Sequence, residues 1–251
     1  MRQAWLLGQR ALREGWRTPD ALLPTLFIPL FFLVVNVGQA AKIFPGDTTA
    51  FLNGQGYGAF QLPASLLLAA SFGTAALFMV EEIEGGYFDK LRAAPIPRSS
   101  IVLGRLIAEF FKAVLIAVAI VLLGMVFGIE IASGVLGFVL LVLLTATWAV
   151  VFVGFMQIIA MKTRSAAATN SAGLIFFPLL FLTPNFVPRD MLTRPMEIAA
   201  TLNPVTYVME GLRSLVLVDL DWTDIFQGFA VVAVAAAVML VLSVRLINHY
   251  D

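Results

Sequence analysis

The sequence predicts an all-α protein that crosses a membrane several times. Three observations predict this fold class. Of the 251 residues, 60% are hydrophobic, where soluble domains have roughly one half. Only 13% are charged, against about a quarter in a soluble domain. The apolar residues also form long continuous runs, and a membrane-spanning helix needs about 20 such residues in succession.

Six apolar runs are long enough, and we expect each to form one transmembrane helix. They cover residues 21–41, 59–80, 101–127, 131–161, 166–182 and 225–247, of which the fifth is the shortest. The runs lack the alternation of apolar and polar residues that is typical of a transmembrane barrel strand. The sequence therefore favours a polytopic membrane protein with six transmembrane helices, and we predict one membrane domain over residues 1–251.

The basic residues indicate how the helices are oriented. They gather before the first run, after the second and fourth runs, and near the C-terminus: Arg2, Arg10, Arg13, Arg17, Lys90, Arg92, Arg98, Arg105, Lys162, Arg164 and Arg245. The alternate loops are poorer, with Lys42 in one and no basic residue beside Glu130. Since short loops rich in Lys and Arg stay in the cytoplasm, we predict a multi-pass protein of the cell (inner, cytoplasmic) membrane with both termini cytoplasmic.

Residues 1–19 predict an amphipathic helix that lies in the headgroup layer. On a helical projection Trp5, Leu12 and Trp16 share one face, and the arginines of this segment gather on a neighbouring face. That pattern is typical of interfacial helices, although a basic tail without fixed structure would have the same composition. Thr18 is a candidate cap, and Pro19 a first-turn residue, for the helix that follows.

Residues 81–99 form a charged segment between two apolar runs and predict a short cytoplasmic helix. The Gly85-Gly86 pair permits a sharp change of direction. The apolar side chains that follow at helical spacing are Tyr87, Phe88 and Leu91. Pro95 then ends the helix, and Ser99 or Ser100 is a candidate cap for the third span. The alternative is an ordinary interfacial turn whose aromatic side chains anchor it to lipid.

The sequence lacks the residue constellations of common enzyme classes. It has no cysteine, which excludes disulfides and thiolate metal sites, and its single histidine is His249. It has no G-x-x-x-x-G-K-[ST] loop, so we expect no nucleotide site on this chain. Its formal net charge of +0 provides no basic footprint for nucleic acid. We predict no catalytic residue, no metal, no cofactor on this chain and no nucleic-acid partner.

Charged residues inside the predicted spans are few. Glu109 and Lys112 are three residues apart in the third run, so they share a helix face and can form an ion pair. We interpret them as a structural pair near the cytoplasmic end; a role in transport is the alternative, because ionisable residues in spans are often functional. No acid is evident near mid-membrane, which argues against a carrier driven by an ion gradient.

Residues 184–224 predict an extracellular hairpin region. Prolines divide it into short pieces at Pro184, Pro188, Pro195 and Pro204. The short fifth run before it is expected of a chain that turns back before it leaves the membrane. Non-helical backbone at that depth occurs only where protein covers it or where it faces a wet cavity. We therefore predict a re-entrant hairpin.

Three motifs resemble segments of one transporter family. EEIEGGYFDKLRAAPIPRSSIVLGRL, which begins at residue 81, resembles the cytoplasmic loop of type-2 ATP-binding-cassette exporter permeases. LNPVTYVMEGLRSL, residues 202–215, is similar to the N-P-x-x-Y-x-x-[DE]-x-[LA]-R segment before the last span in the drug-export branch. FLTPNFVPRDM resembles the extracellular hairpin of that branch. Together with the N-terminal helix and the six spans, the resemblance covers the whole chain. Tyr87 with Phe88 departs from the more polar helix start expected there.

The resemblance implies the transmembrane permease subunit of an ATP-driven exporter, which is not itself an enzyme. The loop after the second span would be a coupling helix, seated on a separate cytoplasmic ATPase subunit that binds ATP and magnesium. The implied contact residues are Glu81, Glu82, Glu84, Gly85, Tyr87, Leu91, Arg92 and Pro95. A second permease subunit, identical or a sister chain, would complete the path through the bilayer.

The resemblance also implies where cargo would cross. The path candidates, in the first and fifth spans, are Phe27, Phe31, Asn36, Phe176, Phe177 and Phe181. The outer-gate candidates are Pro184, Asn203, Pro204, Tyr207, Glu210 and Arg213. Any one of the phenylalanines could instead face lipid or pack between helices, and the asparagine could join two helices.

Spans without an acid or base at mid-membrane suggest an amphiphilic or hydrophobic cargo, such as a drug, a lipid or a glycolipid. Export of a polysaccharide is the alternative within the family. Two rival functions lie outside it. One is a secondary transporter driven by an ion gradient, and the other is a membrane scaffold protein that moves no cargo.

Overall fold

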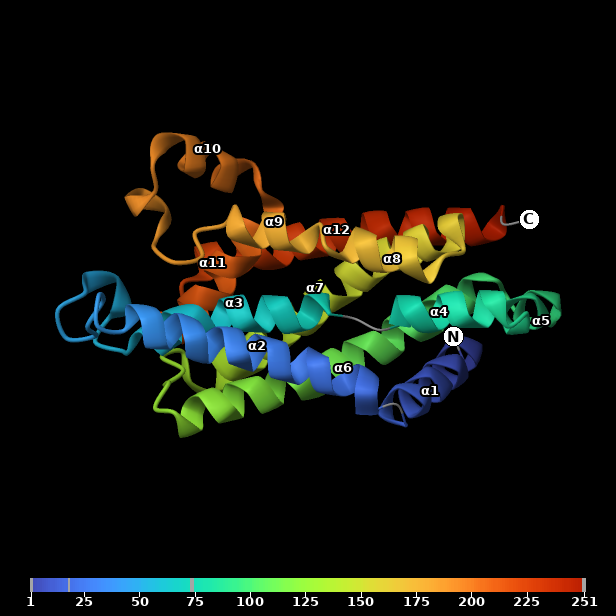
Figure 1. The fold of residues 1–251 in the computed structure, drawn as a ribbon, viewed down its shortest axis with the longest axis horizontal. Coiled ribbons are helices and arrows are strands. Elements are labelled where there is room, and N and C mark those ends of the chain that lie inside the picture. Colours follow the sequence, from blue (N-terminus) through green and yellow to red (C-terminus); the bar gives the residue numbers. More distant parts are fainter. Residues whose placement is uncertain (1, 18, 73–74, 250–251) are drawn as a thin grey trace.

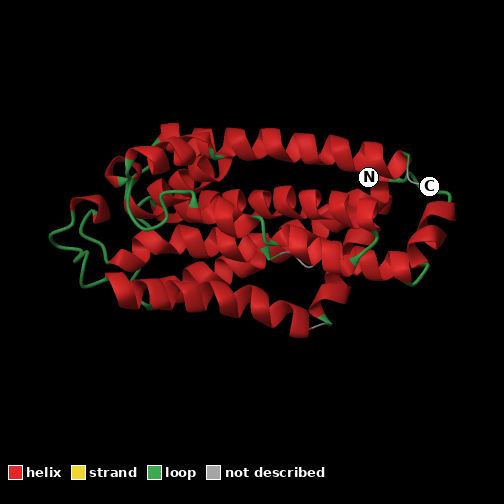
Figure 2. Ribbon diagram, turned by 45° about the horizontal axis from the view of Figure 1, so that its top comes forward, coloured by secondary structure: helices red, strands yellow, loops and turns green. Residues whose placement is uncertain are grey.

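The structure is a computed structural model, which describes residues 2–17, 19–72 and 75–249. Its helices are α1 (Arg2–Trp16), α2 (Pro19–Ala40), α3 (Tyr57–Ser71), α4 (Ala75–Glu84), α5 (Tyr87–Ala93), α6 (Ser99–Val126), α7 (Gly134–Thr163), α8 (Ala166–Gly173), α9 (Phe176–Phe181), α10 (Arg194–Leu202), α11 (Pro204–Leu217) and α12 (Trp222–Asn248), with 3₁₀ turns η1 (Ala50–Leu52) and η2 (Arg189–Met191). Figure 2 shows helices and loops, and the described residues contain no strand. The predicted all-α class is confirmed.

Five stretches of helix are long and apolar enough to cross a membrane. They are Leu23–Ala40 in α2, Tyr57–Glu84 across α3 and α4, Ser99–Val126, Gly134–Thr163 and Trp222–Asn248. Each coincides with a predicted span. The remaining predicted span, 166–182, is present as two short apolar helices, α8 and α9, so a count of six spans stays a prediction. The break has a local cause, because Pro178 has no backbone N–H to donate to the carbonyl four residues earlier.

The long helices run side by side along the long axis of the molecule, which gives the bundle two distinct ends (Figure 1). Both chain termini lie at one end with α1 and α5, and we call this the terminal end. The connections 41–56 and 127–133 lie at the other end with α10, and we call this the loop end. The clusters of basic residues named above flank the terminal end, where the chain repeatedly returns.

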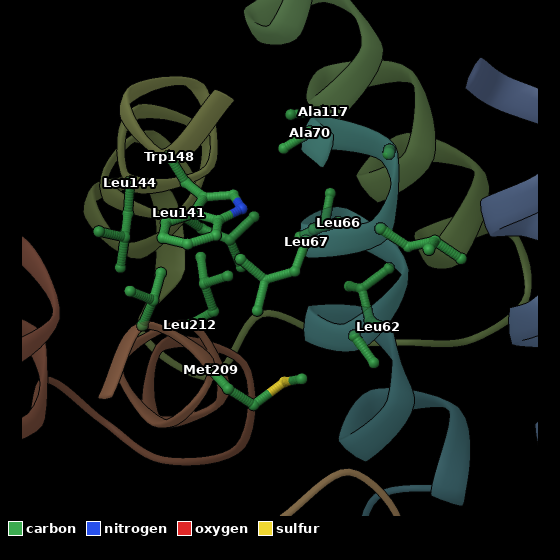
Figure 3. Packing of buried hydrophobic residues seen from close by; sticks show 14 of the residues in the cluster. Leu62, Leu66, Leu67, Ala70, Ala117, Leu141, Leu144, Trp148, Met209 and Leu212 are labelled. Carbon is green, nitrogen blue, oxygen red and sulfur yellow. The ribbon is translucent and has the colours of Figure 1, made fainter. Parts of the chain in front are cut away.

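Helix α3 forms the centre of the bundle. Fourteen of its residues are buried, from Tyr57 at its start to Ser71 at its end, and it packs against α2, α6, α7 and α11. Figure 3 shows Leu67 of α3 pointing towards α7 and α11, where Leu141, Leu144, Trp148, Met209 and Leu212 lie, whereas Leu62 lies on the opposite side of α3, beside Gly124 of α6. A helix enclosed on all sides is expected to be apolar around its whole circumference.

Helix α1 lies obliquely against α6 at the terminal end (Figure 1). Its buried residues include Ala4 and Gly8, and a Cβ atom placed on Gly104 would lie 2.7 Å from Leu7 Cβ. The two helices therefore touch through small residues, as closely packed membrane helices commonly do. Trp5, on the predicted apolar face, is 44% exposed. The predicted cap Thr18 and the Trp16 side chain lie outside the described residues.

This close contact generates a prediction about Gly104. We expect Gly104→Leu to lower the midpoint of thermal unfolding of the purified protein in detergent, because overpacking typically costs about 1 to 3 kcal/mol. Gly38→Leu is the matched control, since a Cβ there would meet nothing within 4 Å. Equal midpoints for the two variants would contradict the packing of α1 on α6.

Candidate functional site

The charged segment forms the predicted turn and short helix at the terminal end. Helix α4 ends at Glu84, and the Gly85 N–H donates to the Glu81 carbonyl at 2.8 Å. Gly86 has a φ of 69°, a left-handed conformation that glycine adopts at little cost. Helix α5 then begins at Tyr87. The predicted change of direction and short helix are confirmed.

The predicted serine cap of the third span is wrong. Helix α6 begins at Ser99, but no side chain caps its first turn. Arg98 already has helical angles, with φ −54° and ψ −35°, and the Ile101 N–H, which a Ser99 cap would accept from, donates to the Arg98 carbonyl at 3.1 Å. A backbone turn therefore satisfies the donor that a serine hydroxyl was expected to satisfy.

Helix α5 has an anchored side and an outward side. Phe88 is buried in a cluster with residues of α4, α6 and α7, so it fixes α5 to the bundle. Of the predicted contact residues, Glu81, Glu84, Gly85, Tyr87 and Pro95 are exposed, while Leu91 and Arg92 are half-buried. The predicted apolar patch is therefore divided, because Phe88 faces inward and Tyr87 faces outward.

Glu82 is the member of the predicted contact set that faces the protein interior. Its side chain is only 8% exposed, and its Oε1 accepts from Arg10 Nη2 at 2.9 Å. Its other oxygen pairs with Arg105, which is also buried. The Arg10 guanidinium lies 4.2 Å from the centroid of the Tyr87 ring. One carboxylate thus joins α1, α4 and α6, and Arg10 extends the connection to α5.

A cavity of 460 Å³ opens where α2, α4, α7 and α8 meet the end of α3 and the start of α9. Two interruptions of helix meet there: α3 ends at Ser71 and Phe72, and α8 ends at Gly173. Backbone that leaves a helix at membrane depth is tolerated where protein covers it or a cavity receives it. Of the predicted path residues, Phe176 and Phe177 line this cavity.

The walls of this cavity are aromatic and uncharged. Phe72 and Phe177 make an edge-to-face contact at 6.1 Å, and Phe176 meets Phe152 at 5.5 Å. The polar groups in the lining are neutral: Thr25, Ser71, Asn170 and Ser171. Trp148 Nε1 donates to Ser71 Oγ at 3.0 Å, which places that hydroxyl at the helix end. Phe72 was missed from the sequence, because nothing in the second run marked where its helix would end.

The remaining path candidates lie elsewhere. Phe27 and Phe31 stack at 6.0 Å on the outer face of α2, where Phe27 is 66% exposed. Phe181, at the end of α9, is also exposed. Asn36 donates to Gln61 Oε1 at 3.5 Å and so connects α2 to α3. The structure therefore divides the predicted path into a cavity wall, an outer apolar face and one interhelical hydrogen bond.

At the loop end, the chain that leaves α9 is held by three successive carbonyl groups. The oxygens of residues 184, 185 and 186 accept from Arg213 Nη1 at 2.9 Å, Gln61 Nε2 at 3.0 Å and the Tyr57 hydroxyl at 2.8 Å. We call these three bonds the hairpin attachment. Tyr57 and Gln61 were missed from the sequence, because they lie at the edge of the second apolar run, more than a hundred residues before their partners.

The other gate candidates surround the same hairpin. Asn203 caps α11 by accepting from the Val205 N–H at 3.0 Å, and its Nδ2 donates to the Leu179 carbonyl at 2.6 Å. Pro204 is the first residue of α11. The Tyr207 hydroxyl donates to the Thr201 carbonyl at 2.9 Å. All six predicted gate residues therefore lie at the loop end, on or beside the hairpin and α11.

Two charged residues of α11 line a 530 Å³ hollow at the loop end. Arg189 donates through Nε to Glu210 Oε1 at 3.0 Å. Arg213 is buried with its Cζ 3.6 Å from the Phe60 ring centroid, and its Nη2 has no hydrogen-bond partner. Burial lowers the pKa of Arg213 to about 9. Burial also raises the pKa of Glu210, although Arg189 acts in the opposite direction.

The predicted ion pair within the third span is confirmed. Lys112 Nζ lies 2.7 Å from Glu109 Oε2, and both side chains are buried in α6. Among the described residues, no group of three or more histidine, cysteine or acidic side chains could hold a metal ion. The charged groups of this bundle thus serve packing and attachment in the described structure.

The fold and these sites define a multi-pass membrane protein whose cavity is apolar and whose charged contacts lie at the two ends of the bundle. Comparison with known families assigns it further. Residues 2–217 match the family model described as ABC-2 type transporter, and the chain belongs to that family. The family resemblance predicted from the three motifs is confirmed. Its members are membrane transport subunits and not enzymes, and the family does not favour a gradient-driven carrier.

Curated relatives agree with this assignment. The chain is 24% identical over 247 residues to the daunorubicin resistance ABC transporter permease protein DrrB1 of Streptomyces coeruleorubidus, covering 96% of this chain and 84% of that protein. It is 26% identical over 242 residues to the "Putative transport permease ycf38" of Porphyra purpurea, covering 88% and 80%. The protein of the same name from Pyropia yezoensis is 22% identical over 254 residues, covering 90% and 81%.

The raised pKa of Glu210 generates a prediction about pH. A raised pKa means that folding disfavours the ionised carboxylate. The stabilising contribution of protonated Glu210 is therefore complete below the ordinary value of 4.5 and is lost as pH rises through the raised pKa. We expect Glu210→Gln, which cannot ionise, to gain stability relative to wild type as pH rises from 4.5 towards neutral.

The measurement is the thermal unfolding midpoint of the purified protein at a series of pH values. Glu130→Gln is the matched control, because Glu130 is an exposed acid at the same end of the bundle. Parallel pH curves for wild type and Glu210→Gln would show that the environment of Glu210 does not disfavour its ionised form.

Proposed function

We propose that this chain is the transmembrane subunit of an ATP-driven exporter for amphiphilic or hydrophobic cargo, with residues 1–251 forming a single permease domain. The observation that supports it most directly is the uncharged aromatic cavity at two helix interruptions, which α4 connects to the exposed face of α5. Cargo would be accepted at the cavity, and the force that moves it would enter at α5.

In this proposal the terminal end faces the cytoplasm of a cell membrane. The arginines and lysines of α1, α5 and the connection after α7 support that orientation, because short basic segments are retained on the cytoplasmic side. The loop end, with the hairpin region 184–224, then lies outside. With this orientation a soluble cytoplasmic protein can reach α5, and the hairpin attachment lies at the outer end of the proposed cargo path.

In this proposal the ATPase subunit that drives transport is a separate chain. ABC-2 permeases work with a cytoplasmic ATPase partner, and this sequence has no phosphate-binding loop of its own, so ATP and magnesium bind to the partner. The contact surface consists of the exposed residues of the coupling segment: Glu81, Glu84, Gly85, Tyr87 and Pro95, flanked by Leu91 and Arg92. Glu82 has a different role, because its two ion pairs hold the segment on the bundle.

The cavity limits the chemistry of the cargo. A lining of phenylalanine, methionine and neutral polar side chains offers no counter-charge to a buried ion, and burying an unpaired charge is costly. Aromatic walls instead favour flat apolar groups, which stack on them or meet their edges. The similarity of the chain to a daunorubicin resistance permease supports a drug-like cargo.

A second permease subunit, identical or a sister chain, would cover the outer face of α2. Phe27 and Phe31 lie there with Leu23 and Val34, all strongly exposed. Phe181 and Phe186 form a neighbouring exposed aromatic pair at 6.3 Å. Lipid alone can cover such a face, but the transport path in this proposal lies between two permeases, and Pro24 and Thr25 of α2 line the cavity.

The hairpin attachment would act as the outer gate. Export requires the exit to open, and opening must release the carbonyls of residues 184–186 from α3 and α11. Each such bond has a net value of about 1 kcal/mol, so the gate is closed by several weak bonds and one ion pair. A barrier of that size is within reach of ATP-driven movement of the bundle.

The contact assignment predicts the effect of reversing charge on α4 and its turn. We expect Glu81→Lys with Glu84→Lys to reduce co-purification of a co-expressed ATPase subunit at least about tenfold, because both side chains are exposed and reversed charges oppose docking. Asp47→Lys with Glu130→Lys is the matched control, with the same change in charge at the loop end. Retained co-purification in the first variant, with unfolding midpoints unchanged, would refute the assigned surface.

The cavity assignment predicts the effect of filling it. A Cβ on Gly173 would lie 3.1 Å from Met156 Cε, so Gly173→Leu would occupy the cavity. We expect this variant to lose the stimulation of ATP hydrolysis that aromatic amphiphiles cause in the reconstituted complex, while basal hydrolysis persists. Phe226→Ala, at an exposed position on α12, should retain stimulation. A Gly173→Leu complex that responds like wild type would remove the cavity from the cargo path.

A further inference from the structure

Helix α1 has a hollow of 600 Å³ on its outer side, lined by Leu6, Gln9, Arg10, Arg13, Glu14 and Arg17. We call it the arginine notch. Its three arginines are three and four residues apart, so they follow one face of the helix. Arg13 and Arg17 are exposed, and the Arg10 side chain is 42% exposed.

The charges of the notch are unbalanced. It contains three guanidinium groups and one carboxylate, and no carboxylate of the described residues lies within salt-bridge distance of Arg13 or Arg17. Like charges along one helix face repel one another. An anion bound between them would remove that repulsion, and guanidinium groups bind phosphate with paired hydrogen bonds in a fixed geometry.

The surroundings of the notch indicate where the anion comes from. Trp5 and Leu6 are exposed beside it, on a helix that lies obliquely at the end of a membrane bundle (Figure 1). Exposed tryptophan next to arginine is typical of helices whose apolar side enters the boundary between acyl chains and headgroups. The phosphate that meets a basic side chain in this layer belongs to a lipid, and clusters of basic residues beside spans attract anionic lipids.

We propose that the arginine notch binds the headgroup phosphate of an anionic phospholipid, with Arg13 and Arg17 as its principal donors and Arg10 at its inner edge. Arg10 also pairs with Glu82 and covers the Tyr87 ring. Arg10 therefore connects the bound lipid directly to Glu82 and Tyr87 of the coupling segment. Occupancy of the notch fixes α1 and, through Arg10, steadies the exposed face of α5.

The experiment is a lipid titration of the purified full-length permease in detergent, with the thermal unfolding midpoint as the readout. We expect phosphatidylglycerol to raise the midpoint more than phosphatidylcholine does. Arg13→Gln with Arg17→Gln should raise the half-saturating phosphatidylglycerol concentration roughly thirtyfold, because each basic side chain near an anionic lipid surface contributes roughly fivefold in affinity. Added salt should weaken the wild-type response.

Two controls make the outcome decisive. Arg2→Gln with Lys162→Gln removes the same charge from exposed positions outside the notch, and it should keep the wild-type response. Glycerol 1-phosphate, which has the phosphate but no acyl chains, should give no shift at the same concentrations. Equal responses of the two double variants, or of the two phospholipids, would overturn the proposal. A full response to glycerol 1-phosphate would assign the notch to a soluble phosphate instead.

Discussion

The ion-pair cluster around Glu82 is the interaction on which the terminal end of the bundle depends. A carboxylate and a guanidinium removed from water lose several kcal/mol of hydration each, so they persist only where each satisfies the other. Glu82 meets this condition with Arg105 on one side and Arg10 on the other. These ion pairs couple the positions of three helices. The pair with Arg105 holds the end of α4 to α6, and the pair with Arg10 holds it to α1. In the proposed coupling, a force applied to α5 would therefore reach α4, α6 and α1 together.

The same force has a defined route towards the middle of the membrane. Helix α4 begins at Ala75, just beyond the end of α3, while α3 is enclosed by its neighbours and firmly packed. Bending in helices concentrates where the ladder of backbone hydrogen bonds is interrupted. Phe72, where α3 ends, and Gly173, where α8 ends, both line the cavity. Movement of α4 relative to α3 would thus change the shape of the cavity, because both helices contribute residues to its lining.

Particular residues show what the sequence could and could not predict. Hydropathy located five long helices to within a few residues, because burial in lipid demands continuous apolar runs. Local chemistry located the turn at Gly85-Gly86 and the pairing of Glu109 with Lys112. Contacts between distant segments were not predictable. Glu82 and Glu81 are adjacent acids with the same local sequence signal, and only the packing of α1 and α6 decides that Glu82 is buried. The donors of the hairpin attachment, Tyr57 and Gln61, depend on the same kind of long-range placement.

In the proposed gate, the contacts that close the loop end are made to the backbone. The three bonds of the hairpin attachment end on carbonyl oxygens, so they depend on the path of the hairpin and hardly on its side chains. The ion pair of Arg189 with Glu210 adds charge to that attachment. Glu210 and Arg213 are three residues apart on α11 and share one face of it, and Arg213 already has an unused donor at Nη2. If the hairpin moved away, it would take Arg189 with it and break the ion pair with Glu210. Arg213 would remain beside Glu210, so the Glu210 carboxylate would still have a positively charged neighbour. The charge arrangement of α11 therefore lowers the cost of separation while the carbonyl bonds keep the closed state defined.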